Sequence, residues 1–370
     1  MRQESYITST APARAALLEN RNSAEGLCPS RAACQRVARC IGAAPSRGMA
    51  GRACCEESHA RGLVLVPIAN PVGLTQQVQS AHLGRSALTS GKNFNRRFPA
   101  LEPQLIERAG PKFSADPQSN VTFIRNVIAE LVTEYVTYHG DEKLKLELLR
   151  LSIGADYVID LHCDSEALLH FDTNDSAWSQ LHLLATQIGA QAVMLAQCSG
   201  GEPFDEAVAR PLLELAAHAN NKAVPIACHS CTVELRGHTD VSDDFATTDA
   251  RNLTKFLMCI ACIDGDTDEL PASQVRATPV AGVEYIRSPS AGVIAYVAQL
   301  KTNVKRDHHV GTVVDSYASA ATARTKIHAQ RPRNIYARSL GRVAPSGSLL
   351  VTIAGEAAAS TPSDITLLSD

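Results

Sequence analysis

The sequence predicts an α/β fold, a sheet with helices on its faces, followed by a smaller all-β domain. Between residues 62 and 272, short apolar runs of strand length alternate with longer segments in which apolar residues recur at helical spacing. From Val280 onward, short runs of period two are separated by glycines, a pattern typical of a small all-β unit. We therefore expect a first domain at 62–272 and a second at 273–358, with a tail at 359–370.

The elements of the first domain follow from these patterns in chain order. The clearest helix opens after a Ser-Asn cap and repeats Val121, Ile124 and Ile128 on one face. The expected helices are 119–139, 141–154, 176–189 and 206–220. The expected strands are 64–69, 157–161, 192–195 and a run that ends at Glu234.

The second domain repeats the form G-x-V followed by V-x-x-G, which resembles a biotinyl/lipoyl-type barrel. Its strand-like runs are 281–298, 310–315 and 334–355. The segment KTNVKRD contains Lys301 and Lys305, but no hairpin tip of the Met-Lys-Met type accompanies them. We interpret both lysines as solvated charges rather than as lipoylation sites.

The composition is that of a soluble enzyme and excludes several functional classes. With 370 residues the chain is long enough for two domains with sizeable cores. A net charge of −3 and a pI near 6.5 provide no basic field for nucleic acid. No apolar run approaches the roughly 18 residues that span a bilayer. We expect a cytoplasmic protein with a small-molecule substrate and neither a nucleic-acid nor a membrane partner; the oligomeric state stays open.

One apolar strand runs directly into the sequence Asp-Leu-His. The strand at 157–161 places His162 at its carboxyl end, where ligands gather in parallel α/β sheets. Asp160 is two residues earlier and therefore on the same side of the strand, where it can orient the imidazole of a metal ligand. Taken alone, such a histidine is more often structural than metal-bound. The motif becomes a metal-site hypothesis only together with other segments.

Three segments occur in a family order: LVLVPIANPVG with SGKNFNRRFP, GADYVIDLHCD, and ACHSCTVELRGHTD. Together they resemble the succinylglutamate desuccinylase/aspartoacylase family, which are zinc-dependent deacylases related to metallocarboxypeptidases. The resemblance covers roughly residues 62 to 358. It implies a zinc-carboxypeptidase-like mixed sheet flanked by helices. Without it, FNRRFP would be interpreted as a solvated turn and VELRG as an edge strand.

The resemblance implies a role for each matching residue. Asn95 and Arg96 would grip the substrate carboxylate, His162 would be the third zinc ligand, and Glu234 would be the general base. The chemistry agrees, because a guanidinium matches a carboxylate and a glutamate can take the proton of an attacking water. Arg85 is a candidate for a second carboxylate or oxyanion contact, although its spacing to Asn95 departs from the simplest family pattern.

The family's other two zinc ligands are missing from the sequence. They come from an H-x-x-E motif followed by Pro-Gly, placed before the strand at 63–67, and no such motif occurs here. Glu56, Glu57 and His59 cluster, but in the wrong order and spacing. A catalytic zinc needs about three protein ligands. We therefore predict that the chain with this sequence binds zinc poorly and is inactive.

The composition of residues 1–61 suggests translation in the wrong frame. They contain nine Arg and no Lys or Asp, and five of the eleven Cys. Shifted by one nucleotide, the codons from Ala24 through Cys40 can read Leu-Lys-Val-Tyr-Val-Gln-Ala-Ala-Leu-His-Ala-Asn-Glu-Leu-Pro-Gly. The shifted reading contains an apolar strand followed by the missing H-x-x-E motif. The codon for the His of this motif spans Ala33 and Cys34. We expect 1–61 to be an aberrant, poorly ordered segment that leaves the strand at 63–67 without its upstream neighbour.

An organellar transit peptide is the alternative interpretation of this segment, because such peptides are rich in Arg and poor in acids. Five glutamates count against it, at positions 4, 19, 25, 56 and 57.

Two C-x-x-C pairs, CHSC at 228–231 and CIAC at 259–262, allow a four-thiolate zinc site. Their separation exceeds the usual ~15–20 residues, and both lie in strand-like or buried-helix patterns. We predict reduced, packed cysteines. A redox role lacks the βαβ context that such pairs usually have.

Three functional hypotheses remain. The first is a zinc-dependent hydrolase that cleaves the amide or ester of an N-acylated, carboxylate-bearing small molecule. The second is a carboxypeptidase-like peptidase or amidase on the same fold. The third is a non-catalytic binding protein, which the sequence favours if the upstream segment is genuine.

Overall fold

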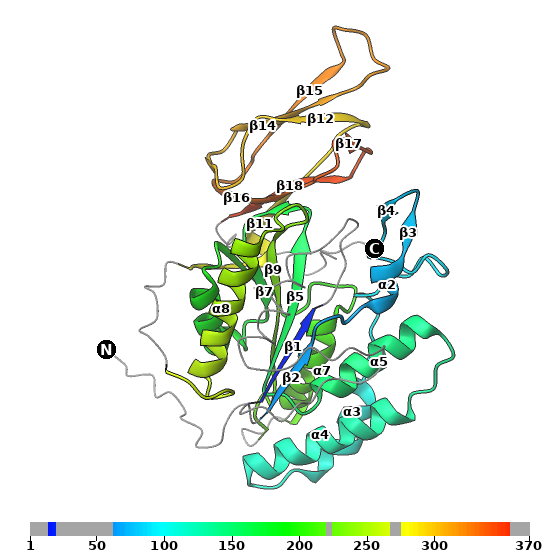
Figure 1. The fold of residues 1–370 in the computed structure, drawn as a ribbon, viewed down its shortest axis with the longest axis vertical. Helices are drawn as coiled ribbons and strands as arrows, with labels where there is room; N and C mark the ends of the chain where they lie inside the picture. The colour runs from blue at the N-terminus through cyan, green and yellow to red at the C-terminus, as the bar shows by residue number, and fades with distance from the viewer. Residues whose placement is uncertain (1–13, 20–61, 220–223, 267–274, 356–370) are drawn as a thin grey trace.

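A seven-stranded sheet in the order β10-β8-β7-β9-β5-β1-β2 forms the centre of the larger domain (Figure 1). The computed structural model describes residues 14–19, 62–219, 224–266 and 275–355. The strands are β1 Ala15–Glu19, β2 Leu63–Val66, β5 Tyr157–Asp164, β7 His170–Thr173, β8 Ala192–Leu195, β9 His229–Gly237 and β10 Ala277–Pro279. Neighbouring strands are parallel, except that β7 is antiparallel to β9. The predicted mixed sheet is thus confirmed.

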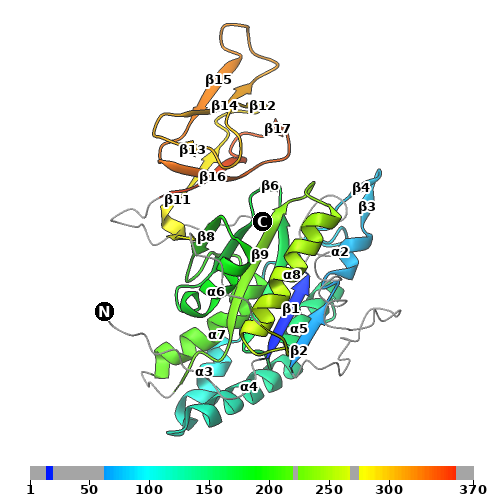
Figure 2. The ribbon, with the colours of Figure 1, turned by 60° about the vertical axis from the view of Figure 1, so that its left-hand side comes forward.

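Helices cover both faces of this sheet (Figure 2). The helices are α2 Pro71–Thr75, α3 Glu102–Ala109, α4 Pro117–Glu134, α5 Gly140–Ser152, α6 Trp178–Ile188, α7 Phe204–Ala219 and α8 Asp243–Cys259. Helices α6 and α8 pack on one face, and α3, α4, α5 and α7 pack on the other. Two 3-10 turns, Gly110–Lys112 and Val280–Gly282, and a small hairpin of β3 Gln77–Val78 and β4 Ala81–His82 complete this domain. In the described part of the chain, no helix is both long and apolar enough to cross a membrane.

Strand β1 lies between β2 and β5, and its residues Ala15, Ala16, Leu17 and Leu18 are buried. Ala15 and Leu17 enter the core beneath α6 and α8, whereas Ala16 and Leu18 enter the opposite core. Strand β2 therefore has an upstream neighbour, contrary to expectation. These four residues are all apolar, so the strand fits a sheet that is buried on both faces. The rest of the supposed out-of-frame segment, 20–61, lies outside the described residues.

Replacing Leu17 by Ala measures whether β1 belongs to the core. Leu17 has no exposed surface, so the variant should lose about 2–5 kcal/mol in the free energy of unfolding. Urea denaturation gives this number, and Leu88→Ala, at a leucine that is 51% exposed, is the matched control. Equal stabilities of the two variants would mean that β1 does not pack in this sheet.

The predicted helices and strands of the first domain are present with shifted ends. Helix α4 begins and ends earlier than expected, because Asp116 caps it by accepting a hydrogen bond from Ser119 N and because the chain becomes extended at Tyr135. Helix α7 accommodates Pro211 in its interior. Strand β7 was not predicted at all. The large sheet also continues past residue 272, since β10 still pairs with β8.

The second domain consists of two antiparallel sheets, which confirms the predicted all-β unit. Its strands are β11 Val283–Arg287, β12 Gly292–Tyr296, β13 Asn303–Val304, β14 His309–Val314, β15 Arg324–His328, β16 Arg333–Arg338, β17 Val343–Ala344 and β18 Leu349–Ala354. One sheet has the order β11-β18-β16-β13 and the other β15-β14-β12-β17. Lys301 and Lys305 are exposed, as predicted. The resemblance to a biotinyl/lipoyl barrel stays a prediction.

The two domains are joined through a short strand, β6 Glu166–Ala167, which pairs with β16. The Glu166 carboxylate accepts hydrogen bonds from both Arg338 and Arg342 of the β-domain. A small apolar cluster that includes Ala167, Met194 and Tyr336 packs across the same junction. This junction holds the β-domain over the end of the large sheet where β5 and β9 finish (Figure 1).

Candidate functional site

Three neighbouring strands carry polar side chains in two rows on one face of the large sheet. In the first row, Glu234 of β9 is level with His162 of β5 and with His170 of β7. In the second row, Thr232 is level with Asp160 and Asp172. Because residues two apart on a strand point to the same side, all six share one face. Their alternate neighbours, such as Ile159, Leu161 and Val233, enter the opposite core.

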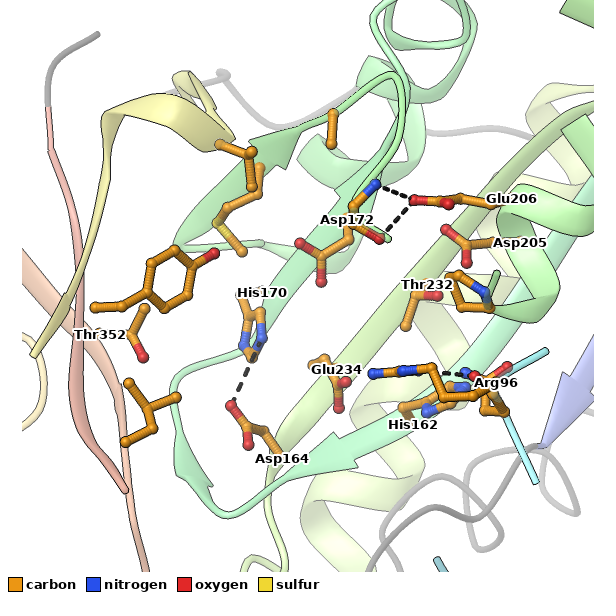
Figure 3. A pocket seen from close by; sticks show the side chains of 18 of the residues that line it. Arg96, His162, Asp164, His170, Asp172, Asp205, Glu206, Thr232, Glu234 and Thr352 are labelled. Carbon is orange, nitrogen blue, oxygen red and sulfur yellow. Dashed lines mark hydrogen bonds and ion pairs between the residues drawn. The ribbon is translucent and has the colours of Figure 1, made fainter. Parts of the chain in front are cut away.

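A cavity of about 860 Å³ opens over these rows (Figure 3). Its floor is the carboxyl end of β5 and β9. The first turn of α7 and the loop that carries Asn95 and Arg96 line it on the side of the large domain. Tyr285, Tyr336 and Thr352 line it from the β-domain. The cavity therefore lies between the two domains, and both supply its walls.

His162 is held by the carboxylate that the sequence assigned to it. His162 is 3% exposed, and its Nε2 lies 2.7 Å from Asp160 Oδ2. Since a carboxylate can only accept, Nε2–H donates and Nδ1 is the nitrogen left for a ligand. Burial disfavours the imidazolium, but the charge and hydrogen bond of Asp160 outweigh burial and raise the pKa of His162 to about 9.

Glu234 has the properties of a proton acceptor that works near neutral pH. It is partly buried, and its Oε2 has neither solvent contact nor a hydrogen-bond partner among the described residues. Burial raises the pKa of Glu234 to about 7, against the opposing charges of His162 and His170. A carboxylate with such a pKa can both take and return a proton.

The loop with Asn95 and Arg96 is fixed by its own polar groups. Asn95 Oδ1 accepts a hydrogen bond of 2.8 Å from Phe204 N at the start of α7, which leaves the Asn95 amide group to donate. Arg96 is 8% exposed, and its Nη1 donates to Asn95 O at 2.7 Å. The ammonium of the buried Lys145 donates to Arg96 O at 2.6 Å, and burial lowers the pKa of Lys145. A rigid loop thus presents an amide and a guanidinium to the cavity.

The structure brings the predicted site residues together. Asn95, Arg96, His162 and Glu234 all line this cavity. Asp160 lies beneath His162 with no exposed surface. Arg85 also lines the cavity, but as an exposed residue. The roles assigned to these residues stay predictions.

Sequence reasoning missed several acidic or basic groups of the same cavity, among them Asp164, His170, Asp172 and Asp205. The alternation in His-Phe-Asp-Thr, directly after the His162 strand, was the available signal for β7. Burial raises the pKa of Asp172 to about 6 and, together with the charge of Glu206, raises that of Asp205 to about 8. Asp205 lies in the first turn of α7, and no pattern in the surrounding sequence indicates that it lines a site.

The described residues do not form a complete metal site. They contain no group of three His, Cys, Asp or Glu placed to hold a metal ion. His162 is the one predicted ligand among the described residues. The H-x-x-E motif of the shifted frame would be encoded within 20–61, which lies outside the described residues.

The C-x-x-C pairs do not form a site either. Cys228 belongs to the core beneath α7 and Cys231 to the core on the opposite face of the sheet, so the thiols do not converge. The four-thiolate alternative is therefore wrong. Burial raises the pKa of Cys228 to about 12 and that of Cys262 to about 11, so these thiols stay protonated and packed.

Three solved structures with the same architecture are described as succinylglutamate desuccinylase/aspartoacylase proteins. A succinylglutamate desuccinylase/aspartoacylase family protein from Shewanella amazonensis has a TM-score of 0.77 at 18% identity, covering 93% of this chain and 91% of that chain. One from Shewanella frigidimarina has a TM-score of 0.76 at 17% identity, covering 94% of this chain and 90% of that chain. One from Rhodobacter sphaeroides has a TM-score of 0.62 at 14% identity, covering 93% and 86%.

By sequence alone, no family model matches the chain and no curated protein is significantly similar to it. The likeness therefore rests on the arrangement of the elements. It extends over most of this chain and most of each solved structure. The chain has the fold of the succinylglutamate desuccinylase/aspartoacylase family, as the resemblance of its three segments predicts.

Proposed function

We propose that the chain has the framework of a hydrolase, a deacylase that cleaves the amide or ester bond of an N-acylated, carboxylate-bearing small molecule. The observation that carries this proposal is the position of Glu234, level with His162 and His170 on the floor of a cavity that Arg96 also lines. The description of the solved structures that share the fold supports the reaction class.

Each group has a chemical task in this proposal. The Arg96 guanidinium pairs with the substrate carboxylate and the Asn95 amide donates a further hydrogen bond, which places the acyl group near Glu234. Glu234 takes a proton from the attacking water while the water oxygen bonds to the acyl carbon. Glu234 then returns the proton to the leaving nitrogen or oxygen as its bond to the acyl carbon breaks. His162 and Asp160 hold a fixed imidazole beside these groups.

Zinc dependence is a further part of the proposal, for a chain that carries the H-x-x-E motif. The described residues supply one ligand, His162, and the carboxylate that orients it. They do not complete a zinc site, so no step above is assigned to a metal. For the chain with the present sequence we propose weak zinc binding and no hydrolysis.

A peptidase or amidase on the same fold is the second candidate, because the cavity is large enough for more than one residue of a peptide. Assays with acyl-amino-acid and peptide panels separate the two reactions. A non-catalytic binding protein is the third candidate. It would bind carboxylate-bearing small molecules without hydrolysing them, even after the motif is restored.

Replacing Arg96 by Ala tests the carboxylate anchor. Binding of an N-acyl amino acid should weaken by on the order of 2–5 kcal/mol, because a nearly buried charge pair is lost. Binding of the matching amide, which lacks that carboxylate, should change little. Calorimetry on the chain with the present sequence gives both values without any need for turnover.

The matched control is Arg97→Ala, which removes the adjacent, exposed arginine that does not line the cavity. Arg97→Ala should bind both compounds as the unmodified chain does. An equal loss for the acid and the amide in Arg96→Ala would instead mean that Arg96 polarises the scissile carbonyl or holds the loop.

A further inference from the structure

The charges that line the cavity differ between its two ends. Asn95 and Arg96 line the side next to β5 and α7, whereas Asp164 and Asp172 flank His170 on the side of β7 (Figure 3). The side of β7 is the one that the β-domain covers. The proposed function uses the arginine end and the centre, and leaves the acidic end without a task.

His170 is fixed so that one of its ring nitrogens remains for the cavity. The residue is 4% exposed, and its Nδ1 lies 2.9 Å from Leu168 O, to which Nδ1–H donates. Its Nε2 is 4.0 Å from Asp164 Oδ2, beyond hydrogen-bond distance. The ring also packs against Tyr336, with 5.0 Å between the centroids. Burial lowers the pKa of His170, but the charges of Asp172, Glu234 and Asp164 outweigh burial and raise it, because the ring lies in acidic surroundings.

Two nearly buried residues of the β-domain bring hydroxyl groups to this cavity. Tyr336 and Thr352 are each 5% exposed and both line the cavity. Neither hydroxyl makes a hydrogen bond within the part of the chain that the structure describes. Burial, Tyr285 and the charges of Asp172 and Asp164 raise the pKa of Tyr336. Because both side chains are nearly buried and line the cavity, a ligand there would supply the hydrogen-bond partner that the hydroxyls lack.

We infer that this end of the cavity is a subsite for an ammonium group of the substrate, formed by Asp164 and Asp172 opposite Tyr336 and Thr352. Carboxylates and hydroxyl oxygens accept hydrogen bonds, and an ammonium group offers three donors. Tyr336 and Tyr285 also line the cavity, and aromatic rings attract cations. A second carboxylate would be repelled by both aspartates, and an apolar group would leave the hydroxyls unsatisfied. Arg287, a cation of the β-domain that lines the cavity, is exposed and donates to Gly347 O.

The inference rests on the proposed function for the orientation of the substrate. With its carboxylate at Arg96 and its acyl group between His162 and Glu234, a substrate continues along the row toward His170. Neighbouring strands are about 4.8 Å apart, so the ammonium group would lie roughly 5–10 Å from the acyl carbon. An N-acylated amino acid with a side-chain amine, such as Nα-acetylornithine, has this reach.

Calorimetry with three probes of matched size tests the subsite on the chain with the present sequence. The probes are Nα-acetylornithine, Nα-acetylnorleucine, which has a methyl in place of the ammonium group, and Nα-acetylglutamate, which has a carboxylate there. Nα-acetylornithine should bind at least about tenfold more tightly than either of the others, because a cation in a partly buried acidic site is paired. Asp172→Asn should reduce that ratio to about threefold or less.

The control variant is Asp307→Asn, which removes the same charge from an exposed residue outside the cavity and should keep the full ratio. Equal or tighter binding of the norleucine or glutamate probe, or no binding of Nα-acetylornithine, overturns the subsite. The subsite is also overturned if the ratio of affinities stays the same in Asp172→Asn, in Asp164→Asn and in the double variant. Should these variants not fold, the ranking of the three probes by the unmodified chain decides.

Failure of the subsite and failure of the proposed function give different results. Hydrolysis of all three probes at similar kcat/KM by a chain with the restored motif would remove the subsite and leave the deacylase. Selective binding of Nα-acetylornithine without hydrolysis of any probe, even with the motif restored, would support the subsite and remove the deacylase.

Discussion

A chain in which the reading frame is restored over the first ~60 codons is expected to hold close to one zinc ion and to hydrolyse N-acyl amino acids. The chain with the present sequence is expected to hold little zinc and to hydrolyse none. A full ligand set contributes on the order of 10 kcal/mol or more to zinc binding, which His162 cannot supply alone. This is the largest difference that we predict for this protein.

The sheet provides a place for the restored ligands. In the parallel pair of β1 and β5, Glu19 is level with Leu161, one residue before His162. A strand in the position of β1 that runs directly into His-Ala-Asn-Glu would therefore present both new ligands beside His162. The proximity follows from the register, since the carboxyl ends of parallel strands meet at one edge of the sheet.

Metal analysis of both purified chains measures the difference, and resequencing of the coding DNA tests its premise. Near-stoichiometric zinc in the present chain that resists chelators and survives replacement of Cys228, Cys231, Cys259 and Cys262 would show that ligands have been missed. Bases that forbid the shifted motif would remove the frame hypothesis.

Glu234→Gln in the restored chain is expected to lose hydrolysis by roughly 10²–10⁴-fold and to keep its zinc. The amide has the size of the carboxyl group but cannot take the proton of an attacking water. His162→Ala should lose both zinc and hydrolysis, because it removes the imidazole that Asp160 orients. Steady-state kinetics and metal content, measured on the same preparations, distinguish the two variants.

Glu130→Gln is the matched control, because this exposed glutamate of α4 does not line the cavity. It should leave both kcat/KM and zinc content unchanged. If Glu234→Gln retained hydrolysis within a few-fold of the unmodified enzyme, Glu234 would not be the base. Asp205 would then be the next candidate, since burial also brings its pKa to about 8.

Regular local patterns made much of the fold predictable. Helix α4 shows its apolar spacing within one window of sequence, and β5 and β8 are apolar runs of strand length. His162, near the end of β5, was proposed because it ends an apolar run, whereas Glu234 of β9 was proposed only through the family resemblance. These features are local, and the sequence contains all the information that they need.

Strand β1 and strand β7 were not predictable in this way. Strand β1 is five residues long in a region of atypical composition, and its place in the sheet depends on pairing with β2 and β5, distant in sequence. Strand β7 is four residues long and has one apolar residue, Phe171, because His170 and Asp172 face the cavity rather than a core. A short strand is stabilised by its neighbours, so that its own residues carry little signal.

The sequence by itself determined most of the order of helices and strands and the division into an α/β and an all-β part. The resemblance of its three segments pointed to Asn95, Arg96, His162 and Glu234 as candidate site residues. The tertiary structure decided which groups these residues meet. Only the register of β5, β9 and β7 sets Glu234 level with two histidines, and only the packing of the β-domain brings Tyr336 and Thr352 over Asp172. The reason is physical: periodicity reflects contacts with near neighbours in the chain, whereas a site is formed by contacts between strands and domains that are far apart in sequence.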